Sequence, residues 1–498
     1  MRKILQESVL ILFLLTMGMV FSSFTFDDSL NDEELMQTTK KSKEEIVTGG
    51  ALNSPIRVSA AQGSTVPESK DNKGARWTFM MYLNADNDLE DVGIADLNEL
   101  EAGIKNASDI TVIVLMDRSE DYDTTNGDWT GTRLYKVMSD DSGLINSMLL
   151  EDKGEVNMGQ SSVLTEFINY CFANFSADHY ILDLWGHGAG IDGICFDYTN
   201  WHDKLTIEEM QAAIEASEAA YNEKIDIICH DACLMGMIEV AFELRNVADY
   251  FVSSEETVPD NGYDYKDIIN RLLANTSMTP QQVANEIVNS YHDQYTQESD
   301  TTLSAIELST LSNIIPYVNN FAGNLSLTIP EGHTNAIINA RADTAEFDDN
   351  DFIDFIHFAE NIEANTTLMS NYPNLQASVT ALIDRLNECI FSNYQHPIYS
   401  SHANGLSIYM PYGENVNINR YNSSTGNYAA IDWITTSTWR FFLSSLITGR
   451  YVMPPPSTTS STDTNLIVFT PGFPLLGTTV IFTILGIVLI ITRRKNKY

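Results

Sequence analysis

Cysteine is scarce in this sequence, which has only five cysteines in 498 residues, all between Cys171 and Cys389. Thiols so few and so widely spaced exclude a disulfide scaffold, and an odd number leaves at least one thiol unpaired. Positive charge is scarce too, because 28 Lys and Arg oppose 68 Asp and Glu, for a net charge of −40. Such a surface repels phosphate, so we expect no nucleic-acid partner. The hydrophobic content of 44% nevertheless excludes a disordered acidic polymer.

Long hydrophobic runs stand at the two ends of the chain. Residues 1–24 begin with a short basic segment followed by a mostly apolar run, which predicts a signal peptide or an N-terminal anchor. Residues 475–492 carry no charge and precede a basic tail at 493–498, which predicts a transmembrane helix with the tail in the cytoplasm. A Pro/Ser/Thr-rich stalk at 453–470 and a linker or propeptide at 27–75 flank a large domain at 76–450. We therefore expect a single-pass cell-membrane protein whose large domain faces outward.

Within the large domain, short apolar runs alternate with amphipathic segments. The apolar runs predict buried strands at 77–83, 110–116, 180–185 and 225–229. The intervening segments predict helices at 89–104, 163–175, 206–220 and 234–245. This alternation predicts an α/β fold with a mainly parallel central sheet and helices on both faces. Active sites and ligand-binding sites in such folds lie at the carboxyl ends of the strands. Two successive predicted strands are followed there by His187 and Cys233.

His187 and Cys233 are candidates for nucleophilic catalysis. A thiolate nucleophile needs an imidazole to take its proton and backbone N–H groups to hold the oxyanion. His187 stands between glycines, and Cys233 stands at the predicted start of a helix, whose N-terminus would lower the pKa of the thiol. The ordinary structural explanation is that Cys233 is only a buried small residue and that the Gly-His-Gly segment is only a tightly packed turn. The 46-residue separation (233 − 187), with His first, is near that of caspases and favours chemistry.

Other ligand chemistries fit the sequence less well. The Gly-x-Gly-x-x-Gly pattern at 188–193 precedes an extended segment where a dinucleotide site requires a helix. Zinc ligation by Cys229, His230, Cys233 and His187 lacks a second closely spaced ligand pair, so we expect no zinc. The acidic loops at 121–123 and 348–351 do not have EF-hand spacing, but a calcium site of another type stays open.

Several blocks of this sequence resemble the clostripain family of cysteine peptidases, which are relatives of caspases and gingipains. The most specific blocks contain His187, at 177–190, and Cys233, at 231–236. Further likeness follows the first two predicted strands and continues through the region between Cys233 and the C-terminal end of the domain. These further blocks lie at 81–90, 114–118, 254–259, 262–265 and 405–411, so the resemblance covers about 76–450.

The resemblance implies a caspase-like α/β/α sandwich and a cysteine endopeptidase that acts through a thioester acyl-enzyme. It implies a His187/Cys233 dyad without an obligatory third member, with the oxyanion held by the backbone N–H groups of Gly188 and Cys233. It also implies protein or peptide substrates with Arg or Lys before the scissile bond, bound by acidic groups. Asp231 matches the first acidic position. Asp260 is the favoured second acid, and the alternative alignment puts the neutral Asn261 there.

Family members often mature by self-cleavage between the His and Cys blocks, where this chain has two basic residues, Lys204 and Lys224. Lys204 stands in a polar stretch before a predicted helix, so the Lys204–Leu205 bond is the expected cut. Lys224 adjoins a strand and is expected to be less accessible. The resemblance implies no certain cofactor, and calcium is possible because some relatives need it. A catalytically silent surface adhesion or scaffold protein with the same fold is the alternative function.

Overall fold

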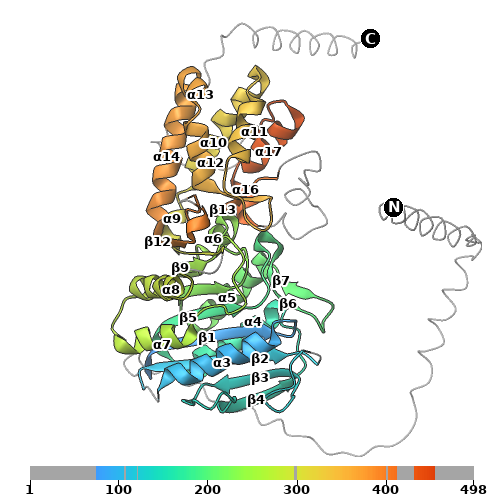
Figure 1. Cartoon of the computed structure of the whole chain (residues 1–498), viewed down its shortest axis with the longest axis vertical. Coiled ribbons are helices and arrows are strands. Elements are labelled where there is room, and N and C mark those ends of the chain that lie inside the picture. Colours follow the sequence, from blue (N-terminus) through green and yellow to red (C-terminus); the bar gives the residue numbers. More distant parts are fainter. Residues whose placement is uncertain are drawn as a thin grey trace, which may run out of the picture. The chain divides into compact units, whose positions relative to one another are not determined.

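The computed structural model describes residues 74–105, 108–120, 122–296, 300–399, 402–411 and 431–454 (Figure 1). The predicted signal or anchor at 1–24, the membrane helix at 475–492 and the basic tail at 493–498 lie outside the described residues. So do all but the last residues of the linker at 27–75 and all but the first of the stalk at 453–470. Among the described residues, no helix has both the length and the apolar character needed to cross a bilayer.

A nine-stranded sheet forms the centre of the fold, in the order β12-β10-β9-β8-β5-β1-β2-β3-β4 (Figure 1). Its strands are β1 Ala75–Ala85, β2 Ile110–Arg118, β3 Gly131–Lys136, β4 Met148–Gly154, β5 Ala177–Trp185, β8 Ile225–Asp231, β9 Ala248–Ser253, β10 Thr302–Glu307 and β12 Ile390–Gln395. The five central strands, β9-β8-β5-β1-β2, are parallel, and the two strands at each edge are antiparallel. The four predicted strands all lie in the parallel centre, so the predicted α/β fold with a mainly parallel central sheet is confirmed.

Helices cover both faces of this sheet because its central strands are apolar on both sides. On β1, Phe79, Met81 and Leu83 enter one core with the helices α3, α7 and α8. The alternate residues Met80 and Tyr82 enter the other core with α4, α5 and α6. The bounds of these helices are α3 Glu90–Ile104, α4 Ser161–Asn174, α5 Ile207–Tyr221, α6 Ile238–Leu244, α7 Tyr265–Ala274 and α8 Pro280–Gln294.

The C-terminal part of the domain is mostly helical and completes the same compact unit. Its helices α10, α12, α14 and α17 pack together, and rings from them surround the buried Trp439. The block at 405–411 contains strand β13, which pairs with β11 in a separate two-stranded sheet. The elements of this part are α9 Leu308–Leu311, α10 Ile315–Thr328, η2 Ile329–Glu331, α11 Thr334–Ala342, β11 Phe352–Asp354, α12 Phe355–Glu363, α13 Thr366–Asn371, α14 Pro373–Cys389, η3 Pro397–Tyr399, β13 Ser407–Tyr409, α16 Asp432–Thr436 and α17 Trp439–Thr448.

Between β5 and α5 the chain forms a small hairpin outside the main sheet. After the single turn η1, Gly190–Asp192, strand β6, Ile194–Asp197, pairs with β7, Asp203–Leu205. Thr206 then begins α5 with a capping box, in which its side chain and that of Glu209 each bind the other residue's backbone N–H. This hairpin lies directly after the predicted histidine, and Tyr198, between its two strands, stacks on the His187 ring.

Candidate active site

The predicted histidine and cysteine follow adjacent parallel strands, β5 and β8, and their loops touch. Gly186 adopts a φ of +135° after β5, where the backbone passes close to Asn84 of β1. Gly188 packs on the cysteine loop: an ideal Cβ there would lie 2.5 Å from the carbonyl oxygen of Cys233. A side chain at Gly188 would therefore push the two loops apart. Gly188, next to His187, allows the close approach of the two loops.

The backbone after Cys233 does not form the predicted helix, so the prediction of a helix over 234–245 is wrong at its start. Leu234 has a φ of +64° and donates its N–H to the carbonyl of Glu256, and α6 begins only at Ile238. The predicted lowering of the thiol pKa by a helix N-terminus is also wrong. Burial raises the pKa of Cys233, opposed by the Val258 N–H, which donates to Sγ at 3.4 Å. Proton removal therefore depends on the imidazole.

His187 has two neighbours that fix its ring. Its Nε2 lies 2.7 Å from Oδ1 of Asp88, in the turn between β1 and α3, and this hydrogen bond lowers the pKa of the Asp88 carboxyl. The ring of Tyr198 stacks on the imidazole with centroids 5.9 Å apart and planes 10° apart. Sequence reasoning missed Asp88, although its position after the first strand, at the same sheet edge as His187, was an available signal. With Nε2 bound to Asp88, Nδ1 is the nitrogen left for the thiol.

One cavity of about 100 Å³ contains the predicted dyad and both predicted pocket acids. Its lining includes His187, Cys233, Asp231 and Asp260, and Asn261 is not part of it. The structure thus brings together four side chains that stand up to 73 positions apart in the sequence (260 − 187). Of the two alignments left open for the second acid, the geometry favours Asp260. This acid is exposed at the cavity rim, whereas Asp231 is buried.

Asp231 belongs to a group of buried carboxyls behind the cavity. Its Oδ2 accepts hydrogen bonds from the Tyr263 N–H and the Tyr265 hydroxyl, both at 2.9 Å. The same hydroxyl lies 2.7 Å from Asp183, and burial together with that neighbour raises the pKa of Asp231 to about 8. Asp96 is also buried nearby, and burial together with its neighbour Asp231 raises the pKa of its carboxyl. No Lys, Arg or His within the described ranges forms an ion pair with these three acids.

The backbone amide of Gly188, the predicted oxyanion donor, does not pair with β6. Opposite β6, the Ala189 N–H donates to Gly193 at 3.0 Å and the Cys195 N–H donates to His187 at 2.9 Å. These two hydrogen bonds flank Gly188 in an isolated antiparallel bridge and leave its own N–H outside the pairing. Gly188 itself lies at the contact between the His and Cys loops.

The predicted self-cleavage residue lies in a strand, so its expected loop position is wrong. Lys204 is in β7, half-buried, with Nζ 4.8 Å from the ring centroid of Phe196, and the next residue, Leu205, is fully buried. Lys224 is exposed over half of its side chain and pairs with Asp249, so the expectation that Lys224 is less accessible is also wrong. Cleavage after Lys204 would require the β6–β7 hairpin to open.

An α/β sandwich with a thiol and an imidazole on adjacent strand ends defines a class of protein, the cysteine peptidases. The sequence model of the clostripain family matches residues 81–445, which is 365 of the 498 residues. The chain therefore belongs to the clostripain family, and it is a cysteine endopeptidase.

Individual relatives agree with this assignment. Clostripain of Hathewaya histolytica is 25% identical over 406 residues, which span 70% of this chain and 77% of that protein. The fold matches a secreted cysteine protease of Bacteroides thetaiotaomicron, solved with an irreversible peptide inhibitor, at 18% identity and a TM-score of 0.54, over 73% of this chain and 99% of that one. An inactive zymogen protease of Parabacteroides distasonis matches with the same identity and TM-score, over 75% of this chain and all of the other.

Proposed function

We propose that this protein is a membrane-anchored, outward-facing endopeptidase that cleaves after Arg or Lys through His187 and Cys233. The observation that carries the proposal is the shared cavity, in which two carboxylates lie beside the dyad. Asp231, at the buried end, has Asp183 and Asp96 near it and no basic side chain of the described part of the chain paired with it. A guanidinium or ammonium group that enters the cavity would supply the positive charge that this group of acids lacks.

The reaction follows from the positions of the two loops. His187 takes the proton from Sγ of Cys233, and the thiolate attacks the carbonyl carbon of the scissile bond. The backbone N–H groups of Gly188 and Cys233 hold the oxyanion. His187 then gives its proton to the leaving amine, which departs and leaves a thioester on Cys233. Water, deprotonated by the same imidazole, attacks the thioester and releases the acid product and the free thiol.

Membrane attachment and self-processing complete the proposal. The uncharged run at 475–492 and the basic tail at 493–498 support a single span with the peptidase domain outside. Self-cleavage after Lys204 is supported by its position between His187 and Cys233, on the hairpin next to the site. Truncation after residue 470 should move the protein from the membrane fraction to the soluble fraction. Retention in the membrane fraction would instead assign the anchor to residues 1–24.

The test of the activity uses the full chain in detergent, its Cys233→Ala variant and a matched Cys171→Ala variant. Cys171 is buried in α4, outside the cavity, so its loss should leave activity in place. Peptides that differ only in Arg, Lys, Asp or Leu before the scissile bond are assayed with and without calcium. We expect cleavage after Arg and Lys that disappears only with Cys233. Cleavage after Leu alone would contradict the role of the acids, and no cleavage of any peptide by folded protein would favour the scaffold alternative.

A further inference from the structure

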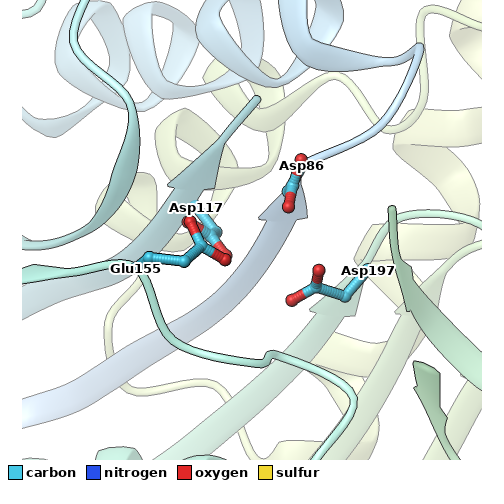
Figure 2. A group of neighbouring side chains, drawn as sticks. All are labelled: Asp86, Asp117, Glu155 and Asp197. Atoms are coloured by element: carbon cyan, nitrogen blue, oxygen red, sulfur yellow. The ribbon is translucent and has the colours of Figure 1, made fainter. Parts of the chain in front are cut away.

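Four carboxylates from separate parts of the chain meet at the carboxyl ends of β1 and β2. Asp86 follows β1, Asp117 lies near the end of β2, Glu155 follows β4 and Asp197 ends β6. One oxygen atom from each of the four lies within 4.8 Å of the others. Figure 2 shows their side chains converging from these elements on a common point. Three of the four residues are buried, and Glu155 closes the group from the solvent side.

Negative charge in this acidic cluster is uncompensated by protein groups. No Lys, Arg or His in the described part of the chain forms an ion pair with any of the four acids, and the guanidinium of the adjacent Arg118 instead binds Glu90. Carboxylates held this close without a cation repel one another, so the arrangement needs a reason.

A buried oxygen atom aimed into the acidic cluster is a second, independent sign of a ligand. Oδ2 of Asp117 is fully buried and makes no hydrogen bond of ordinary geometry. The residues in register with Asp117 on the two neighbouring strands, Asn84 and Thr132, are also buried with side-chain polar atoms that lack partners. Leaving a buried polar group unsatisfied costs about 1–3 kcal/mol. A bound ion would satisfy the Asp117 oxygen directly.

We propose that Asp86, Asp117, Glu155 and Asp197 bind one hard divalent cation, and that Ca²⁺ fits them best. The donors are all carboxylate oxygens, which suit Ca²⁺ or Mg²⁺ and do not suit Zn²⁺. A calcium ion with bonds of about 2.3–2.6 Å separates opposite ligands by about 4.6–5.2 Å, which matches the spread of the acidic cluster, whereas Mg²⁺ at about 2.0–2.1 Å requires a tighter group. Water molecules would complete the six to eight ligands that Ca²⁺ takes.

The cation would act on the active site through the segment that contains Asp86. The Asp86 carbonyl accepts the Tyr198 N–H at 2.9 Å, and its carboxylate accepts the N–H and the hydroxyl of Thr199 at 3.1 and 3.0 Å. Tyr198 is the residue that stacks on His187, and Asp88, two residues after Asp86, accepts the hydrogen bond from that imidazole. Cation binding thus holds both neighbours of His187 in place, and the acidic cluster is a positioning site outside the peptidase cavity.

The experiment measures binding on the full chain in detergent with Cys233→Ala, so that it is independent of peptide cleavage. Calcium and, separately, magnesium are titrated calorimetrically at 0.15 M KCl, which screens diffuse attraction to an acidic surface. Glu155→Gln is the main variant because Glu155 is exposed and its replacement should not prevent folding. Asp117→Asn is the second variant, and Asp141→Asn, in the exposed loop between β3 and β4, is the matched control. Hydrogen exchange of residues 195–203 is followed with and without calcium.

We expect one saturable calcium site that binds magnesium at least tenfold more weakly. Glu155→Gln and Asp117→Asn should each weaken calcium binding tenfold or more, and Asp141→Asn should leave it unchanged. Calcium should slow exchange in 195–203 in the parent and not in Glu155→Gln. The proposal is overturned if all three variants bind calcium alike, or if binding is unsaturable and disappears with added salt. It is also overturned if calcium does not change the rate of hydrogen exchange in residues 195–203.

Discussion

At the scale of single residues, the two acids of the cavity differ in burial, and so should their effects. Asp231 is 4% exposed and hydrogen-bonded from two sides, whereas Asp260 is exposed at the rim. Losing one partner of a desolvated charge pair costs about 2–5 kcal/mol, and losing one partner of an exposed pair costs about 1 kcal/mol or less. The buried carboxylate should therefore dominate the preference for a basic side chain.

Replacing Asp231 by Asn should lower kcat/KM for an Arg peptide at least about thirtyfold, which corresponds to about 2 kcal/mol. Asp260→Asn should lower it by less than about fivefold, because solvent screens the exposed carboxylate. Asn261→Asp is the control: it adds a carboxylate outside the cavity lining and should change little. Steady-state kinetics with Arg and Leu peptides measure the three variants. Equal losses for Asp231→Asn and Asp260→Asn would contradict the assignment.

Asp88 should act on the rate more than on substrate binding. Its carboxylate holds Nε2 of His187 and lies outside the cavity lining, so its loss frees the ring without removing a substrate contact. We expect Asp88→Asn to lower kcat about tenfold with KM nearly unchanged, a modest effect because the pair is solvent-accessible. Asp91→Asn is the control, because Asp91 is exposed in the first turn of α3, the helix that follows Asp88. A rise in KM at constant kcat would show that Asp88 contacts substrate.

At the scale of elements, the parts predicted from sequence are those whose environment is uniform. Strands β1, β2, β5 and β8 are buried on both faces, which leaves continuous apolar runs in the sequence. The edge strand β4 is exposed along most of its length and carries no such pattern. The start of α6 was mispredicted because the carbonyls of Ser254 and Glu256 bind the N–H groups of Gly236 and Leu234. Such long-range contacts leave no local signal.

The candidate site shows the same division between local and long-range information. His187 and Cys233 were found because each stands in a distinctive block at the end of a predicted strand. The pocket role of Asp231 came from the family resemblance, and Asp88 and the acidic cluster were missed. Single carboxylates after strands are common, and their meaning appears only when β1, β2, β4 and β6 are assembled. The sequence therefore located the predicted catalytic residues, whereas the groups that position them became visible only in the folded structure.

The hairpin β6–β7 sets the conditions for self-processing. Its strands share two register pairs, Ile194 with Leu205 and Asp197 with Asp203, and local opening of this short hairpin would expose the Lys204–Leu205 bond. We expect the full chain to yield a new N-terminus at residue 205, and Lys204→Gln to prevent this. Lys224→Gln, the control at the more exposed lysine, should not prevent it. N-terminal sequencing decides, with Cys233→Ala as the uncleaved reference, and a new N-terminus at residue 225 would reverse the assignment.

At the scale of the whole molecule, a net charge of −40 coexists with acids buried in the fold. Asp96, Asp183 and Asp231 are almost fully buried near one another, and burial raises the pKa of each above its ordinary value. The folded state therefore binds protons that the unfolded state has already released. Stability falls as pH rises from the unfolded pKa, about 4, through the folded pKa values. A basic substrate side chain is expected to offset the repulsion among these acids when it binds.

Asp183 allows this pH dependence to be tested without touching the cavity lining. Burial raises its pKa to about 7, and its Oδ1 has no hydrogen-bond partner. Asp183→Asn, in the Cys233→Ala background, should raise the free energy of unfolding more at pH 8 than at pH 5. The difference should be roughly 2–3 kcal/mol, since two pH units below the folded pKa are worth about 1.4 kcal/mol each. Any cost of the new amide is the same at both pH values and cancels. Urea unfolding at fixed calcium measures the difference, with the exposed Asp141→Asn expected to show none. A larger gain at pH 5 would mean that Asp183 is ionised in the native protein, which would contradict its raised pKa.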